Sequence, residues 1–294
     1  MNLYPVSSRT GTPVILGGLG EIADGYEALL CDVWGVVHDG RRAHASAVEA
    51  LQRFRAGRGP VILLSNAPRP AEDVEEQFAR LGVPPDCYDS ILTSGMLTRE
   101  DLERRAGGKP LRMLHIGPER DSGIFAGLPV QRVDAGAAEI VLCTGLLDDD
   151  AETPEDYRAL LSRLKERKLT LLCANPDIVV QRGGRLVWCA GALARLYTEL
   201  GGKSVYYGKP HAPIYMAALG LVRTAARHGE PRVLALGDGL ETDIRGANTA
   251  ALDAVFIADG VHGEDIRELT GAALAELFAT AGVVAKGAMR TLVW

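Results

Sequence analysis

The sequence is best interpreted outward from the stretch Tyr26-Glu27-Ala28-Leu29-Leu30-Cys31-Asp32-Val33-Trp34-Gly35-Val36-Val37-His38-Asp39-Gly40. Its apolar run from Ala28 to Cys31 has the length and composition of a buried strand, and the run ends at a carboxylate followed by a glycine-containing turn. Asp32 is therefore expected at the C-terminal end of a strand. Ligands of open parallel α/β sheets bind beyond such ends, so Asp32 is a candidate functional residue. The alternative at this point is an aspartate that caps a helix or forms a turn.

The composition is that of a globular protein with an acidic balance. Of the 294 residues, 47% are hydrophobic and 24% are charged, which suits one large core or two domains. The formal net charge of −6 and the pI near 5.6 argue against a nucleic-acid polymer as partner, because neutralising its phosphates requires a basic surface.

The cysteines indicate a reducing compartment. Their number is odd, they form no Cys-x-x-Cys pair, and several lie in apolar runs, so we expect reduced, buried thiols at Cys31, Cys87, Cys143, Cys173 and Cys189. No apolar run approaches 18 residues, and the N-terminus has no secretory leader pattern. The expected location is the cytoplasm, without a membrane partner.

Strands and helices alternate in the first part of the chain. Residues 1–20 resemble an irregular lead-in, and after the first strand a helix is predicted from Ser46, where apolar residues recur on one face. Strands are predicted at 60–64 and 89–93, with a helix at 72–81 between them. This order predicts βαβ units and hence a parallel sheet.

A second series of elements begins near residue 96. Strands are predicted at 111–116, 139–143 and 169–173, and Thr153 with Asp156 forms a capping-box pattern for a helix between the last two. Further strands are predicted at 204–207, 232–236 and 253–257. We therefore expect an α/β protein with a Rossmann-like core at 21–95 and 204–294 and an inserted α/β domain at 96–203.

Polar residues that suit phosphoryl transfer follow four of these strands. They are Asp32, Ser65, Lys209, and Asp238 with Asp243. If these strand ends share one sheet edge, the residues converge on a carboxylate nucleophile, a hydroxyl and an ammonium group for phosphate oxygens, and further carboxylates for a divalent cation. Turn formation and helix capping are the alternative for Asp238 and Asp243 taken singly.

The ordered motifs resemble those of a known superfamily. Asp-Val-Trp-Gly-Val at 32–36, Leu-Leu-Ser-Asn at 63–66, Gly-Lys-Pro at 208–210 and Gly-Asp-x-x-x-Thr-Asp at 237–243 are similar to the four motifs of the haloacid dehalogenase (HAD) superfamily. Within it, Asn175-Pro176-Asp177 and the segment 189–192 resemble subclass IIA, the NagD-like phosphatases. The resemblance implies a HAD-like core with a cap domain inserted between the second and third motifs.

The resemblance also implies a role for each matching residue. Asp32 would be the nucleophile and, together with the Trp34 backbone carbonyl, Asp238 and Asp243, would bind or support Mg²⁺.

Three further residues would act on the phosphoryl group. Ser65 and Asn66 would bind it, and Lys209 would neutralise its charge. In the cap, Asn175 and Asp177 are candidate substrate contacts, and a homodimer formed through the cap is expected by analogy.

Trp34 departs from the pattern of the resembled phosphatases, which place a second aspartate at this position as general acid and base. Loss of such catalysis typically costs about 10²–10⁴-fold in rate. Three explanations remain open: a metal-independent dehalogenase, a slow phosphatase, or a binding or regulatory protein that keeps the site without turnover. In the slow phosphatase, His38 or Asp39 would replace the acid, although a turn-forming role fits both residues better.

Together these features predict a Mg²⁺-dependent phosphomonoester hydrolase. Its substrate would be a small phosphorylated metabolite, such as a sugar phosphate or a nucleotide, and catalysis would pass through an aspartyl-phosphate at Asp32.

Overall fold

The computed structural model describes residues 13–182, 185–225, 229–260, 266 and 269–294. Internal contacts divide the described chain into two compact units. The first contains residues up to Ser65, Glu75–Leu92 and Tyr215–Trp294, and the second contains Asn66–Val74 and Thr93–Ile214.

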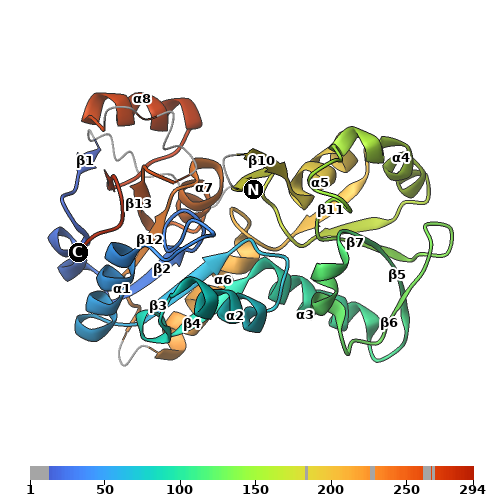
Figure 1. Cartoon of the computed structure of the whole chain (residues 1–294), viewed down its shortest axis with the longest axis horizontal. Coiled ribbons are helices and arrows are strands. Elements are labelled where there is room, and N and C mark those ends of the chain that lie inside the picture. The colour runs from blue at the N-terminus through green and yellow to red at the C-terminus, as the bar shows by residue number, and fades with distance from the viewer. Residues whose placement is uncertain (1–12, 183–184, 226–228, 261–265, 267–268) are drawn as a thin grey trace. The chain divides into compact units, whose positions relative to one another are not determined.

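The first unit is built on a seven-stranded sheet, shown in Figure 1. In spatial order its strands are β1 (Val14–Ile15), β14 (Gly287–Met289), β13 (Asp253–Ile257), β12 (Val233–Gly237), β2 (Ala28–Asp32), β3 (Val61–Ser65) and β4 (Ser90–Thr93). Neighbouring strands from β1 to β3 run parallel. The predicted parallel sheet is therefore confirmed.

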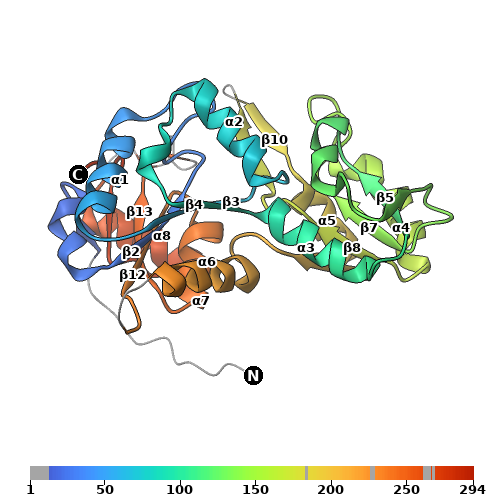
Figure 2. The same cartoon turned by 90° about the horizontal axis from the view of Figure 1, so that it is seen from below.

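Helices cover both faces of this sheet. The chain forms α1 (Ala45–Gly57), α2 (Ala71–Leu81), α3 (Ser94–Ala106), α4 (Arg158–Glu166), α5 (Ala190–Glu199), α6 (Ala212–Ala225), α7 (Arg245–Thr249) and α8 (Gly271–Ala281). Figure 2 shows α1 above the strands of the first unit and α7 below them. Leu274 and Phe278 of α8 pack with Ala247 of α7 against Phe256 of β13.

The central position of β2 explains its unbroken apolar run. All five of its residues are buried, as expected for a parallel strand covered on both faces. The register pairs Cys31 with Leu236 of β12 and Asp32 with Leu64 of β3. Asp32, Ser65 and Asp238 therefore emerge from adjacent strands at the same sheet edge.

The second unit has a five-stranded parallel sheet of its own. The order is β11 (Lys203–Tyr206), β8 (Thr170–Cys173), β7 (Ile140–Cys143), β5 (Leu111–Ile116) and β6 (Val130–Arg132). Apolar side chains of α4 and α5 pack on one face of the sheet, and Leu102 of α3 belongs to the core on the other. In Figure 1, α4 and α5 lie above β7 and α3 lies below it.

A separate antiparallel pair completes the second unit. It consists of β9 (Val179–Arg182) and β10 (Arg185–Trp188). None of the described helices is long and apolar enough to cross a membrane. All five cysteines are free and buried, as predicted.

Several elements differ from the sequence-based expectation. Val14–Ile15, in the expected lead-in, form a strand of the first sheet, and the first turn of the helix predicted after Thr153 is a tighter 3₁₀ turn, Pro154–Tyr157. The strand expected at 204–207 was assigned to the core, but β11 pairs with β8 in the second unit. A short apolar run does not indicate which sheet the strand will join, because the neighbouring strand depends on tertiary packing.

Candidate functional site

Three buried carboxylates meet at the edge of the first sheet. Asp32, Asp238 and Asp243 are 7%, 2% and 5% exposed, and each offers an oxygen within 4.8 Å of the others. The parallel register of β2 and β12 brings Asp32 and Asp238 together, although they lie far apart in the sequence. The convergence expected for these three residues is present.

Two glycines allow the backbone to approach Asp238. A Cβ atom at Gly35 would lie 2.2 Å from Asp238 Oδ2, and one at Gly260 would lie 1.8 Å from the same atom. Gly35 also has a φ of +88°, in the left-handed region that favours glycine. Any larger residue at either position would push against the carboxylate.

Asp243 braces the loop that follows β12. Its Oδ2 accepts hydrogen bonds from the Gly239 backbone N–H at 3.1 Å and from the Thr242 hydroxyl at 3.2 Å. The surrounding residues, Leu240–Ile244, form a single wide π turn, a feature common at functional sites. Asp243 thus both stabilises the turn, which was the alternative interpretation from the sequence, and lies in the carboxylate group.

The donor set fits a divalent cation with oxygen ligands. At an effective dielectric constant near 20, two carboxylates this close repel each other by roughly 3 kcal/mol. A Mg²⁺ ion would offset this repulsion and take carboxylate oxygens as ligands. Asp32, Asp238 and Asp243 are the residues that would hold it. Ser65, at the end of β3, lies one residue beyond the partner of Asp32.

Trp34 packs its ring against the turn that follows it. A Cβ atom at Gly40 would lie 2.4 Å from Trp34 Cη2, and the Trp34 ring meets the His38 ring edge to face, with centroids 5.3 Å apart. His38 in turn contacts Phe78 in the same geometry, at 5.8 Å. The indole is therefore part of the apolar packing of the turn.

His38 and Asp39 are held in roles that do not suit a general acid. His38 is 2% exposed, its Nδ1 accepts the Gly40 N–H, and burial, with His44 nearby, lowers its pKa to about 4. Burial alone would raise the pKa of Asp39, but hydrogen bonds from the backbone N–H groups of Arg41 and Arg42 lower it below the usual value. At neutral pH the first is uncharged and the second ionised, so both serve the turn.

In the second unit, Asn66 holds the backbone of Lys209. Its side-chain Oδ1 accepts the Lys209 N–H at 2.8 Å, and its Nδ2 donates to the Lys209 carbonyl at 3.1 Å. Both residues are buried, with exposures of 5% and 3%. The Asn66 side chain is thereby bonded to both the N–H and the carbonyl of Lys209.

The cap candidates Asn175 and Asp177 form a turn connected to Asn66. Asn175 Oδ1 accepts the Asp177 N–H at 3.1 Å, and Asp177 Oδ1 accepts Asn66 Nδ2 at 2.7 Å. The structure therefore assembles two groups of predicted site residues: Asp32, Ser65, Asp238 and Asp243 in the first unit, and Asn66, Lys209, Asn175 and Asp177 in the second.

A further buried polar group in the second unit was missed from the sequence. His115 Nε2 lies 2.9 Å from Thr144 Oγ1, and the Thr144 hydroxyl also bonds to Asp121. Burial raises the pKa of Asp121 to about 6, although Arg120 and Arg69 oppose the rise. The only signal in the sequence is that His115 and Thr144 flank the ends of predicted strands.

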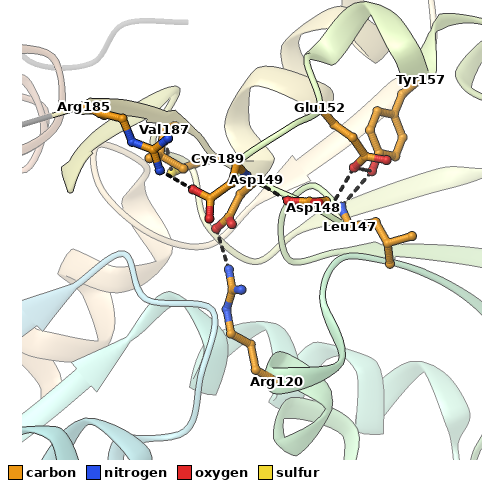
Figure 3. A network of polar contacts seen from close by, with 10 residues as sticks. Arg120, Leu147, Asp148, Asp149, Glu152, Tyr157, Arg185, Val187 and Cys189 are labelled. Carbon is orange, nitrogen blue, oxygen red and sulfur yellow. Dashed lines mark hydrogen bonds and ion pairs between the residues drawn. The ribbon is translucent and has the colours of Figure 1, made fainter. Parts of the chain in front are cut away.

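A second acidic group lies in the loop after β7, and Figure 3 shows its contacts. Asp148, Asp149 and Asp150 offer oxygens within 4.8 Å of one another. Asp149 pairs with Arg120 and Asp150 with Arg185, each at 2.5 Å. Because these arginines compensate the charge of an exposed group, the buried carboxylates of the first unit are the stronger candidate for a metal.

Comparisons with known proteins identify the family of this chain. Residues 29–128 match a family model described as haloacid dehalogenase-like hydrolase, and residues 206–281 match a second one described as HAD-hydrolase-like. A crystal structure of a haloacid dehalogenase-like hydrolase from Brucella suis 1330 is 45% identical, with a TM-score of 0.83, over 95% of this chain and 100% of that chain. The chain belongs to the haloacid dehalogenase-like hydrolase family.

Named relatives in this family are phosphatases. The ribonucleotide monophosphatase NagD of Escherichia coli K12 is 26% identical over 81% of this chain and 89% of its own length. The D-glycerol 3-phosphate phosphatase of Mycobacterium tuberculosis is 29% identical over 82% of this chain and 65% of its own length. A glycerol phosphate phosphatase of the same organism has been solved in complex with magnesium, with 26% identity and a TM-score of 0.61 over 82% of this chain and 70% of that chain. The NagD-like assignment is thereby confirmed.

Proposed function

We propose that the protein is a Mg²⁺-dependent phosphomonoester hydrolase that acts on a small phosphorylated metabolite. The observation that carries the proposal is the buried group of Asp32, Asp238 and Asp243 at the carboxyl edge of a parallel sheet. The substrates named for its relatives, a ribonucleotide monophosphate and D-glycerol 3-phosphate, indicate the class.

The proposed chemistry has two displacements at phosphorus. A carboxylate oxygen of Asp32 attacks the phosphoryl group, the bond to the leaving oxygen breaks, and the alcohol departs after gaining a proton. Water then attacks the aspartyl-phosphate, which releases inorganic phosphate and restores the Asp32 carboxylate. The net reaction consumes one water molecule and yields an alcohol and phosphate.

The remaining residues would hold the phosphoryl group. We assign the Ser65 hydroxyl and the Asn66 backbone N–H to phosphate oxygens and Lys209 to their negative charge. When bound, Mg²⁺ would reduce the repulsion between the Asp32 carboxylate and the phosphate. The Trp34 carbonyl remains a proposed metal ligand.

The domain roles belong to the same proposal. Residues 21–95 and 204–294, apart from β11, would form the catalytic core, and residues 96–203 would act as the cap that selects the substrate. A homodimer through the cap and a cytoplasmic location stay predictions, which size-exclusion chromatography and cell fractionation would test.

The direct test measures phosphate release from a panel of sugar phosphates and nucleotides, with and without Mg²⁺. We expect EDTA to abolish release and Asp32→Asn to remove it, because the amide is a poor nucleophile. Turnover that survives either change would contradict the proposal. Halide release from 2-haloacids without metal would identify the dehalogenase alternative instead.

One observation favours a second candidate, a phosphate-ligand binding protein without turnover. Trp34 is packed into its turn, and neither His38 nor Asp39 is placed or protonated to act as an acid. Saturable, Mg²⁺-dependent binding without phosphate release would support this candidate. Trapping of a phosphorylated Asp32 would exclude it.

A further inference from the structure

We infer that Asp177 is a positioning residue for Lys209, acting through the side chain of Asn66. The inference rests on the proposed function, since it concerns the residue assigned to phosphate charge. It replaces the expectation that Asp177 contacts the substrate.

The hydrogen bonds define a single orientation of the Asn66 amide. Asn66 Oδ1 accepts the Lys209 N–H at 2.8 Å, so its Nδ2 faces the Lys209 carbonyl, 3.1 Å away, and Asp177 Oδ1, 2.7 Å away. Both Nδ2 hydrogens and the carbonyl oxygen are thus used. If the amide were rotated by 180°, its Oδ1 would face two acceptor oxygens, those of the Lys209 carbonyl and of Asp177. The Asp177 carboxylate therefore holds the amide in the orientation that accepts the Lys209 N–H.

Close packing supports this arrangement on the Lys209 side. A Cβ atom at Gly208 would lie 2.3 Å from Asn66 Oδ1 and 3.0 Å from Pro176 Cδ. Glycine before Lys209 is therefore required for Asn66 to reach the Lys209 backbone. In the Gly-Lys-Pro motif, Gly208 thus allows the close contact with Asn66, and Lys209 supplies the ammonium group.

The loop that carries Asp177 is itself fixed by the start of α5. The Gly191 N–H donates to the Asp177 carbonyl at 3.1 Å, and a Cβ atom at Gly191 would lie 2.1 Å from the Pro176 carbonyl oxygen. Asn175 Oδ1 also accepts the Asp177 N–H. The Asp177 backbone is therefore held at both its N–H and its carbonyl, which fixes the point from which its carboxylate reaches Asn66.

The test compares variants that keep or remove the acceptor oxygen. Asp177→Asn can still accept from Asn66, whereas Asp177→Ala cannot. We expect Asp177→Ala to lower kcat/KM by roughly 10–100-fold, because a displacement of about 1 Å has this effect on a reacting group. Asp177→Asn should stay within about threefold of the wild type, and Asp134→Ala, at an exposed position of the same unit, should have no effect.

Two readouts separate positioning from a contact with substrate or from general damage. Asp177→Ala should weaken competitive inhibition by inorganic phosphate by a similar factor and leave the Mg²⁺ activation constant unchanged, because the proposed carboxylate ligands lie in the first unit. Asp177→Ala should also have little effect in an Asn66→Ala background if it acts through Asn66. Equal losses in Asp177→Asn and Asp177→Ala, or additive losses with Asn66→Ala, would overturn the inference.

Hydrogen exchange provides a readout independent of turnover. The Lys209 amide should exchange faster in Asp177→Ala than in the wild type, measured by mass spectrometry on peptides that contain residues 208–211, where Pro210 contributes no amide. Unchanged exchange would contradict the inference. If the wild type releases no phosphate, the proposed function fails, while hydrogen exchange and binding of inorganic phosphate still decide the role of Asp177.

Discussion

At the scale of single residues, Trp34 bears on how the proposed site would protonate a leaving group. Its position is that of the second aspartate in the phosphatases that the motifs resemble, and its ring packs on Gly40 and His38. His38 and Asp39 form hydrogen bonds within the turn. Among the described residues of this turn, we therefore find no donor for proton transfer to the leaving group.

Trp34→Asp should therefore raise kcat most for substrates with poor leaving groups. We expect a gain of roughly 10²–10⁴-fold with alkyl phosphates and a much smaller gain with p-nitrophenyl phosphate, whose leaving group needs no proton. Steady-state kinetics on both substrates would measure this. Trp34→Phe, which changes the packing without adding an acid, is the control, and an equal gain in both variants would refute the explanation.

Asp121 predicts a pH dependence of stability. Burial raises its pKa from 3.8 to about 6. Between pH 3.8 and about pH 6, Asp121 therefore stays protonated in the folded state but is ionised in the unfolded chain. As the pH rises through this range, the free energy of unfolding falls, by roughly 3 kcal/mol in total above the folded-state pKa. The groups facing it are Arg120, Arg69, Thr144 and Asp149.

The test compares Asp121→Asn with the wild type by urea denaturation. The amide has no charge to bury, so we expect the variant to gain up to roughly 3 kcal/mol of unfolding free energy relative to the wild type on going from pH 4 to pH 7.5. Other carboxyl groups titrate in both proteins and cancel in the difference. A difference that does not change with pH would show that Asp121 is not the titrating group.

At the scale of elements, the start of α3 contains a matched pair of hydroxyls. Thr93 caps the helix by accepting the Met96 N–H at 2.9 Å, while Ser94 Oγ is buried and has no hydrogen-bond partner among the residues that the structure describes. Thr93→Ala should cost about 1 kcal/mol of unfolding free energy, the usual loss for a cap. Ser94→Ala should be neutral or slightly stabilising, because the buried hydroxyl gains no bond in return for its desolvation.

Chemical denaturation of both variants measures the contrast, and each serves as the control for the other. A larger loss in Ser94→Ala than in Thr93→Ala would indicate that the Ser94 hydroxyl has a bonding role absent from this structure.

At the scale of the whole molecule, the buried carboxylates couple stability to metal binding. A ligand present at about a hundred times its Kd stabilises the folded state by about 2.7 kcal/mol, so Mg²⁺ should raise the Tm of the transition that includes the first unit by roughly 5 °C. Differential scanning calorimetry with Mg²⁺ or EDTA would measure the shift.

Asp238→Asn should remove most of this shift, since it deletes one of the three buried charges. Asp149→Asn changes a carboxylate of the other acidic group and should leave the shift unchanged. If Asp149→Asn removed it instead, the metal would be bound in the loop after β7.

Local patterns in the sequence predicted the parallel α/β fold and named most residues of the candidate site. The apolar run before Asp32 and the recurrence of polar residues at strand ends are local patterns, and the order of the four motifs adds the resemblance to the HAD superfamily. Such patterns arise because a strand buried on both faces must be apolar throughout, while its C-terminal end is free to carry polar groups.

Strand partners and the contacts of the polar side chains became known from the three-dimensional structure. β11 pairs with β8 in the second sheet, the Asn66 side-chain amide bonds to the Lys209 backbone, and Asp177 accepts a hydrogen bond from Asn66. The physical reason is that strand pairing and side-chain hydrogen bonds are chosen by contacts between residues far apart in the chain, here up to 143 positions for Asn66 and Lys209. The hydrophobic periodicity of a short segment cannot predict contacts between residues so far apart in the chain.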